Sequence, residues 1–164
     1  MLILLALICV LHVATIVMLF VSTIDSSWYI MGTNSTDIWK KCIYVNNSYS
    51  CVDVTDYGNQ DYLRAVQALM ILAVIFSCFS IFSFLVQLFT AEPKRRFFIT
   101  GGIHMLCCLC VMCAASIYTA QFPQPKSQWT AGTYGYSYIL AWICFCLSFI
   151  NSIIYCVLRK KGDD

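Results

Sequence analysis

Residues 65–91 read AVQALMILAVIFSCFSIFSFLVQLFTA, and this stretch contains no charged side chain. At a rise of about 1.5 Å per residue, a helix of about 20 residues crosses the hydrocarbon core of a bilayer. Three further uncharged stretches of at least that length cover residues 1–24, 97–125 and 127–158. The chain is therefore predicted to be an all-α membrane protein with a bundle of four transmembrane helices.

Prolines and glycines set the expected ends of the third and fourth helices. Pro123 and Pro125 are predicted to end the third helix near Phe122, because proline lacks a backbone donor and clashes with the preceding turn. Gly132 and Gly135 predict that the fourth helix begins near residue 134. The chain is expected to be one tetraspan domain with helices over residues 1–24, 65–90, 97–122 and 134–158, outer loops over 25–64 and 123–133, an inner turn over 91–96 and a tail over 159–164.

The composition agrees with a membrane protein and argues against several other classes. Hydrophobic residues make up 60% of the 164 residues and charged residues only 11%, against about 25% charged in soluble domains. A net charge of +2 provides no broad basic face for a nucleic acid. None of the four stretches holds an Asp, Glu, Lys or Arg, so a transporter core is not expected. No phosphate loop, His-Glu-x-x-His pattern or activated nucleophile indicates an enzyme, and no cofactor or metal is expected.

The distribution of basic residues predicts the orientation in the membrane. Residues 94–96 and 159–161 hold six lysines and arginines, against four on the opposite side, and basic segments stay preferentially in the cytoplasm. Both termini are therefore predicted to be cytoplasmic. The two basic segments could also bind anionic membrane lipids, although their place at cytoplasmic helix ends explains them already. A cleaved signal peptide is the alternative for residues 1–24, but that stretch lacks a basic start and exceeds the apolar core of about 7 to 15 residues of a signal.

The long outer loop is expected to fold into a small antiparallel sheet. Segments rich in strand-forming residues lie at 28–31, 42–45 and 49–54, and turn-prone residues separate them at 32–35 and 46–47. A sheet of this size is not stable alone. It needs the helix ends beneath it and a covalent link within it.

Cys42 and Cys51 are the candidates for that link. They are the two of the 11 cysteines that fall in the outer loop, and they flank the turn at residues 46–47 in a way that suits a disulfide between neighbouring strands. The alternative is two free thiols, which would be unusual in an oxidising compartment. Two N-glycosylation sequons, which begin at Asn34 and Asn46, also suit a lumenal loop.

The remaining cysteines lie in the expected helices. Four of them cluster at residues 107–113 and could be interpreted as a metal site, but about 100° per residue scatters their sulfurs around the helix axis. Packing is the simpler interpretation. Cys156 lies three residues before Arg159, near the predicted cytoplasmic interface, and is a candidate for S-palmitoylation.

Polar side chains also occur at membrane depth: His12, Gln67, Gln87, His104 and Asn151. Such groups usually face the bundle interior and hydrogen-bond to one another, and a proton relay is the alternative. In the fourth helix Cys144, Ser148 and Ser152 recur every four residues. This stripe of small side chains would let another helix approach closely.

Several short segments resemble a known family. They are HVAT at residues 12–15, LFVST at 19–23, Trp28, IWKKC at 38–42, Cys51, AVQA at 65–68, MIL at 70–72, QLFT at 87–90, RFF at 96–98, SIYT at 116–119, YGYSYILAWICFC at 134–146 and LRKK at 158–161. With these segments the chain resembles the peripheral myelin protein, epithelial membrane protein and lens MP20 family, a branch of the claudin-like tetraspan superfamily.

The resemblance implies a left-handed four-helix bundle topped by a small extracellular sheet. It identifies Trp28, Trp39, Cys42 and Cys51 as the signature of the superfamily. Relatives often place a sequon just before the first cysteine, and Lys41 removes it here, so a glycan must use one of the two other sequons. The tail lacks the PDZ-binding end of true claudins, and a paracellular pore is not expected.

The resemblance also implies a function. Members of the family are described as plasma-membrane proteins that influence cell adhesion, growth, differentiation, cell death and membrane blebbing, or bleb assembly. They associate with other integral membrane proteins, including integrins and an ATP-gated purinergic channel. The leading hypothesis is a non-enzymatic multi-pass glycoprotein whose outer loop contacts partners, while small-residue helix faces recruit other spans and allow a homo-oligomer. The alternative is a channel subunit or a modulator of an ion channel.

Overall fold

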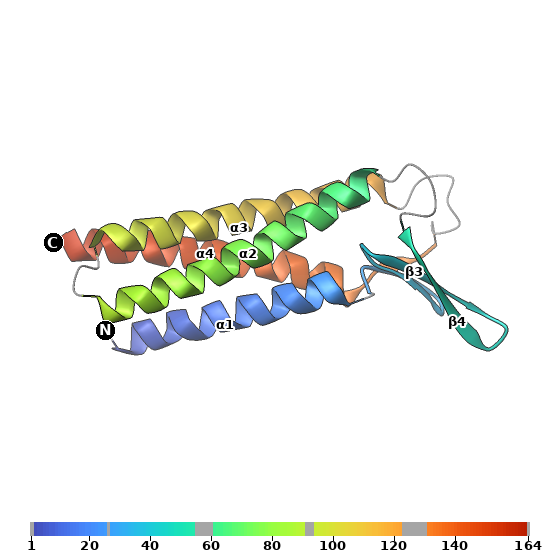
Figure 1. Ribbon diagram of the computed structural model, residues 1–164, viewed down its shortest axis with the longest axis horizontal. Helices are drawn as coiled ribbons and strands as arrows, with labels where there is room; N and C mark the ends of the chain where they lie inside the picture. The colour runs from blue at the N-terminus through green and yellow to red at the C-terminus, as the bar shows by residue number, and fades with distance from the viewer. Residues whose placement is uncertain (1, 26, 55–60, 91–93, 123–130, 164) are drawn as a thin grey trace.

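The computed structural model describes residues 2–25, 27–54, 61–90, 94–122 and 131–163. Four long helices run alternately in opposite directions, and a sheet of five strands lies at one end of them (Figure 1). We call this the sheet end. Both ends of the chain lie at the opposite end of the bundle, as the labels in Figure 1 show.

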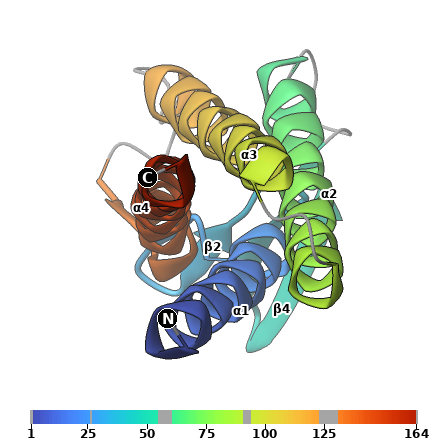
Figure 2. The ribbon, with the colours of Figure 1, turned by 90° about the vertical axis from the view of Figure 1, so that its left-hand side faces the viewer.

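The helices form a closed bundle. Each helix packs against its neighbour in the sequence, and the first also packs against the last (Figure 2). All four are long and apolar enough to cross a membrane, which confirms the predicted fold class. The helices are α1 (Leu2–Ile24), α2 (Asp61–Phe89), α3 (Lys94–Gln121) and α4 (Tyr136–Asp163).

Three helices extend beyond the predicted ranges where the sequence is charged. α2 begins at Asp61 rather than at residue 65, α3 begins at Lys94 within the predicted inner turn 91–96, and α4 continues to Asp163 through the predicted tail. The predicted ends were placed at charged residues, but a charge marks where a helix leaves the hydrocarbon rather than where its backbone hydrogen bonds end. The acidic first turn of α2 and the basic last turn of α4 also interact favourably with the helix dipoles.

The other ends lie within two residues of the predicted ones. α3 ends at Gln121, next to the predicted Phe122, and the prolines predicted to stop it lie outside the described residues. α4 begins at Tyr136 rather than near residue 134, because residues 133–134 belong to a strand. Most of the second predicted outer loop, residues 123–130, also lies outside the described part of the chain.

The predicted antiparallel sheet is present, with two strands that were not predicted. Its strands are β1 (Tyr29–Met31), β2 (Asn34–Thr36), β3 (Lys40–Val45), β4 (Ser48–Asp53) and β5 (Thr133–Tyr134), in the order β4-β3-β2-β1-β5. β2 overlaps the segment 32–35 that was predicted as a turn, because its neighbours on both sides impose the pairing despite its polar Asn-Ser-Thr sequence. β5 comes from the second outer loop and pairs with β1.

Two of the three connections between the first four strands are two-residue turns. Asn46 and Asn47 have φ angles of 51° and 60° and join β3 to β4. This left-handed pair matches the right-handed twist of a hairpin, and asparagine tolerates it better than most residues. Gly32, with a φ of 61°, lies in the turn between β1 and β2.

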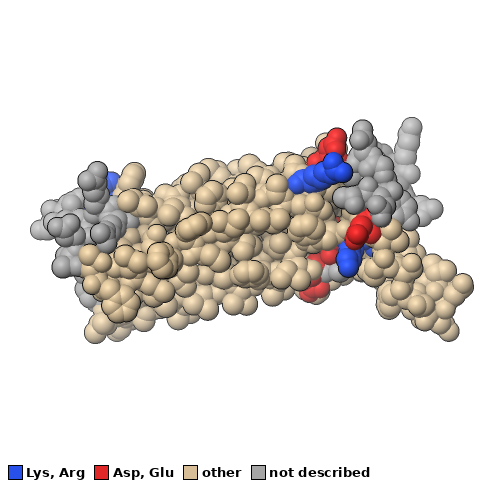
Figure 3. Space-filling view, in the orientation of Figure 1, with Lys and Arg blue, Asp and Glu red and all other residues tan. Residues whose placement is uncertain are grey.

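The outer surface of the bundle is apolar. Val10 and Phe82 each expose 64% of their area, and Phe98 exposes 60%. In the face that Figure 3 presents, the described charged side chains gather toward the ends, chiefly at the sheet end, and the middle carries none. A helix bundle in water would place polar residues on this surface. The surface is therefore suited to lipid.

The stripe of small residues in α4 faces the bundle interior. Cys144, Ser148 and Ser152 are at most 2% exposed. The Ser152 Oγ donates a hydrogen bond to the carbonyl oxygen of Gly101 at 3.1 Å, and the Ser148 Oγ lies 3.8 Å from the Cys107 Sγ. The stripe therefore serves the interior of the bundle, where it brings α3 close to α4, and these three residues are not exposed to other spans.

Candidate functional site

The sheet end is the candidate functional site, because it holds the only strands in the described part of the chain and projects beyond the helices (Figure 1). Two tryptophans fasten it to α1. The Trp28 indole is fully buried and donates to the Ser22 carbonyl oxygen at 2.7 Å. The half-buried Trp39 indole donates to the Thr23 carbonyl oxygen, also at 2.7 Å. Carbonyls in the last turn of a helix lack partners within the helix. The two signature tryptophans therefore supply hydrogen-bond donors to carbonyls that have no partner within α1.

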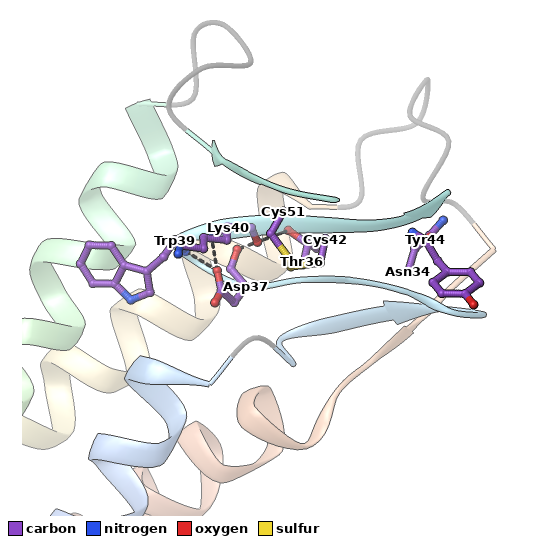
Figure 4. The surroundings of a disulfide bond; sticks show 8 residues. All are labelled: Asn34, Thr36, Asp37, Trp39, Lys40, Cys42, Tyr44 and Cys51. Atoms are coloured by element: carbon purple, nitrogen blue, oxygen red, sulfur yellow. Dashed lines mark hydrogen bonds between the residues drawn. A yellow bond between two sulfur atoms is a disulfide. The ribbon is translucent and has the colours of Figure 1, made fainter. Parts of the chain in front are cut away.

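A turn around Asp37 aims Trp39 at the helix. The Asp37 side chain is 2% exposed, and its Oδ1 accepts hydrogen bonds from the backbone N–H groups of Trp39, at 2.5 Å, and Lys40 (Figure 4). The Asp37 N–H donates to the Lys40 carbonyl oxygen at 2.9 Å. Sequence reasoning missed this residue. The signal in the sequence is the aspartate itself, because an Asp side chain in a turn typically accepts hydrogen bonds from the backbone N–H groups two or three residues later.

A disulfide links the two strands of the hairpin. Cys42 of β3 lies directly opposite Cys51 of β4, and their sulfurs are bonded (Figure 4). Cys42 is 8% exposed and faces the rest of the sheet end, whereas Cys51 is exposed. The bond joins the exposed strand β4 covalently to the strand that is paired on both sides.

Two further attachments fix the sheet to α2 and to the start of α4. Gln67 of α2 was expected to bond within the bundle, but its Nε2 donates to the Ile38 carbonyl oxygen of the sheet end at 2.5 Å. The Gly135 N–H donates to the Trp28 carbonyl oxygen at 2.9 Å. A Cβ atom at Gly135 would lie 1.9 Å from the Ser27 carbonyl oxygen, so this approach requires glycine.

An aromatic cluster fills the space between the sheet and the helix ends. Trp28 meets Tyr118 edge to face with ring centroids 4.9 Å apart. Tyr134 stacks on Tyr138 at 4.3 Å and donates its hydroxyl to the Phe122 carbonyl oxygen at 3.0 Å. Burial raises the pKa of the Tyr134 phenol above its usual value, and the neighbouring tyrosines act in the same direction. The phenol therefore stays a neutral donor at physiological pH.

The profile of the PMP-22/EMP/MP20/Claudin family matches residues 1–155. The chain belongs to this family. It is 48% identical over 164 residues to epithelial membrane protein 1 of Oryctolagus cuniculus, covering 98% of this chain and 100% of the relative. It is 46% identical over 163 residues to epithelial membrane protein 1 of Homo sapiens, with the same coverage. It is 41% identical over 170 residues to epithelial membrane protein 2 of Bos taurus, covering 98% of this chain and 99% of the relative.

Membership of the PMP-22/EMP/MP20/Claudin family agrees with the four spans and with the disulfide-linked sheet. The relatives are named as membrane proteins, and the chain is accordingly a tetraspan membrane protein and not an enzyme. Among the described residues no group of three or more His, Cys, Asp or Glu side chains is placed to hold a metal.

Most predicted polar groups of this tetraspan chain meet partners on other helices. His12 Nε2 lies 2.7 Å from the Tyr155 hydroxyl, and His12 Nδ1 lies 3.1 Å from His104 Nε2. Gln87 Nε2 donates to the Thr100 Oγ1 at 2.5 Å. These contacts tie α1 to α3 and α4, and α2 to α3, as interhelical hydrogen bonding requires. Asn151 is buried as well, but neither its Oδ1 nor its Nδ2 has a hydrogen-bond partner in the described part of the chain, so the predicted pairing is not found for this residue.

The cysteines outside the sheet are distributed around the helices. In α3, Cys107 and Cys108 are buried and Cys113 is exposed, so the four of the cluster do not share one face. Cys156 is exposed on α4. Its S-palmitoylation stays a prediction.

Proposed function

We propose that this chain organises the plasma membrane by associating with other integral membrane proteins through its sheet. The observation that supports this proposal is the fixed position of an exposed hairpin. β4 exposes five of its six residues, while the sheet is anchored to α1 through Trp28 and Trp39 and to α2 through Gln67. A rigid, exposed strand loses little conformational freedom on binding.

The proposed orientation places the sheet outside the cell and both termini in the cytoplasm. The disulfide needs an oxidising compartment, which the sheet end would meet during secretion and at the cell surface. The basic residues of the opposite end, such as Arg159 and the last-turn Lys160 and Lys161, then lie on the cytoplasmic side, as such residues prefer. On that side the exposed Cys156 is within reach of palmitoylating enzymes.

The family resemblance supplies the expected partners and consequences. Integrins and an ATP-gated purinergic channel are the partner classes we expect, together with membrane lipids and a second copy of the chain. The cellular effects that we propose are on adhesion, growth, differentiation, cell death and blebbing. Association alone can produce them, because a bound tetraspan changes the trafficking and the local concentration of its partner.

Native co-purification from epithelial cells in mild detergent tests this proposal. Ser50→Arg places a large cation in the middle of the exposed strand β4. Gln121→Arg places the same cation at the exposed last residue of α3, which lies at the sheet end but outside the strands. We expect partners to co-purify with the wild type and with Gln121→Arg and to be lost with Ser50→Arg. Recovery of the same partners with all three proteins would contradict a role for the sheet.

A stoichiometric ion channel in the complex would instead favour the alternative, in which the chain is a channel subunit or modulator. Patch-clamp recording with that channel decides between the two. Currents that change on co-expression would support modulation, and unchanged currents would leave association as the function.

A further inference from the structure

The two N-glycosylation sequons of the outer loop lie in different environments. One begins at Asn34 and ends at Thr36, and the other begins at Asn46 and ends at Ser48. An acceptor sequon needs an accessible asparagine amide together with the hydroxyl two residues later, on a surface segment. The sequence alone favours Asn34, because Asn46 lies between Cys42 and Cys51, inside the expected disulfide loop.

The sequon at Asn34 is part of the sheet. Asn34 lies in β2, which is paired on both sides, and its Oδ1 accepts a hydrogen bond from the Tyr44 N–H at 2.8 Å (Figure 4). The Thr36 side chain is only 5% exposed, and its Oγ1 donates to the Lys40 carbonyl oxygen at 3.3 Å. Both groups that define the sequon are therefore engaged in holding β2 to β3.

The sequon at Asn46 is free of such engagement. Asn46 and Asn47 form the left-handed turn of the β3–β4 hairpin, and both are exposed, as is Ser48. The Asn46 side chain makes no hydrogen bond within the described part of the chain. Figure 1 shows this hairpin as the part of the molecule that projects furthest from the helices at the sheet end. A glycan attached there meets neither the bundle nor the rest of the sheet.

We infer that Asn46 is the residue that carries the N-linked glycan, and that Asn34 does not. In the reaction, the Asn46 Nδ2 forms a bond to the anomeric carbon of a lipid-diphosphate-linked oligosaccharide. The bond from that carbon to the diphosphate oxygen breaks, and the amide proton leaves with the lipid diphosphate. This inference rests on the proposed orientation of the sheet, since the donor acts in the lumen.

A glycan at this position also accounts for an exposed aromatic pair. Tyr44 and Tyr49 lie opposite each other next to the turn, with ring centroids 4.9 Å apart, and they expose 40% and 62% of their area. Val45 beside them exposes 52%. A bulky hydrophilic glycan on the neighbouring turn shields these rings from non-specific contacts. Partner contacts then use the middle of β4 rather than its tip.

The test is the gel mobility of the full chain, expressed in epithelial cells, before and after treatment with an amidase that releases N-glycans. We expect one downward step for the wild type, no step for Asn46→Gln or Ser48→Ala, and an unchanged step for Asn34→Gln. Asn47→Gln is the matched control, because it changes the same turn and leaves the sequon intact. Loss of the step in Asn34→Gln, its persistence in Asn46→Gln, or two steps in the wild type would overturn the assignment.

Labelling of intact cells with a membrane-impermeant amine reagent separates this inference from the proposed function. Lys40 and Lys41 lie in β3 at the sheet end. A wild type that shows no glycan step but is labelled at these lysines would refute the glycan assignment and leave the proposed orientation standing. A wild type without the step and without the label, in cells where it is delivered to the surface, would refute both.

Discussion

Replacing Trp28 by phenylalanine should destabilise the protein more than the same change at Trp39. The Trp28 side chain is fully buried and donates to the Ser22 carbonyl oxygen at 2.7 Å. A buried carbonyl left without its donor costs about 1–3 kcal/mol. Removing part of the indole volume adds about 1 kcal/mol, since complete truncation of a buried aromatic costs about 3–5 kcal/mol. Trp28→Phe should therefore lower the free energy of unfolding by about 2–4 kcal/mol.

Trp39 makes an equally short hydrogen bond, to the Thr23 carbonyl oxygen, but it is only half-buried. Water can replace its donor, so Trp39→Phe should cost only about 1 kcal/mol. Trp142→Phe in α4 is the control, because the Trp142 indole makes no hydrogen bond in the described part of the chain. The assay is unfolding of the purified protein in mixed micelles with increasing sodium dodecyl sulfate, followed by circular dichroism.

The order of stability of the three variants tests this reasoning. If Trp28→Phe unfolds at the same detergent fraction as the control, the buried bond to the end of α1 does not contribute as argued. If Trp39→Phe is the least stable of the three, burial is the wrong criterion for ranking the two tryptophans.

Three further changes test other parts of the structure. Gly135→Ala should block the pairing of β5 with β1 and cause retention inside the cell, because its Cβ would overlap a backbone oxygen; Gly102→Ala, with open space around its Cβ, should reach the surface normally. Loss of the disulfide should lower the free energy of unfolding by about 2–3 kcal/mol, as expected for a short loop. The effect should be the same in Cys42→Ser, in Cys51→Ser and in the double variant, and reduction of the wild type should reproduce it in the unfolding assay. Tyr155→Phe removes a hydrogen bond between α4 and α1 and should lower stability by about 1 kcal/mol; an increase in stability in the same assay would contradict that role.

The membrane-spanning part of the fold could be predicted from the sequence because its cause is local. An uncharged stretch such as residues 65–91 must form a helix in lipid, since no water is present to bond its backbone. The disulfide could be predicted for a similar reason, because Cys42 and Cys51 flank a short turn that brings their strands together. In both cases the interacting residues are close in the sequence.

The attachments of the sheet could not be predicted, because their partners are distant in the sequence and chemically ordinary. Gln67 bonds a backbone carbonyl at residue 38, and any backbone carbonyl would have matched the amide equally well. β5 pairs with β1 although α2 and α3 lie between them in the sequence, and a strand of two residues is too short to be predicted from strand-forming residues alone. Trp28 and Trp39 were identified only by resemblance, since nothing in a lone tryptophan specifies a helix carbonyl as its acceptor.

The positions of these attachments divide the sheet into two parts. Trp28, Trp39 and the residue pairs of β1 and β5 bind the sheet to the helix ends, so a change there alters the bundle as well. The hairpin of β3 and β4 beyond the disulfide makes its contacts within itself and with β2. Its exposed residues can therefore change without disturbing the membrane-spanning helices. Because binding specificity can vary only where substitutions are tolerated, the hairpin is the part of the chain in which recognition of a partner can be altered while the tetraspan fold is kept.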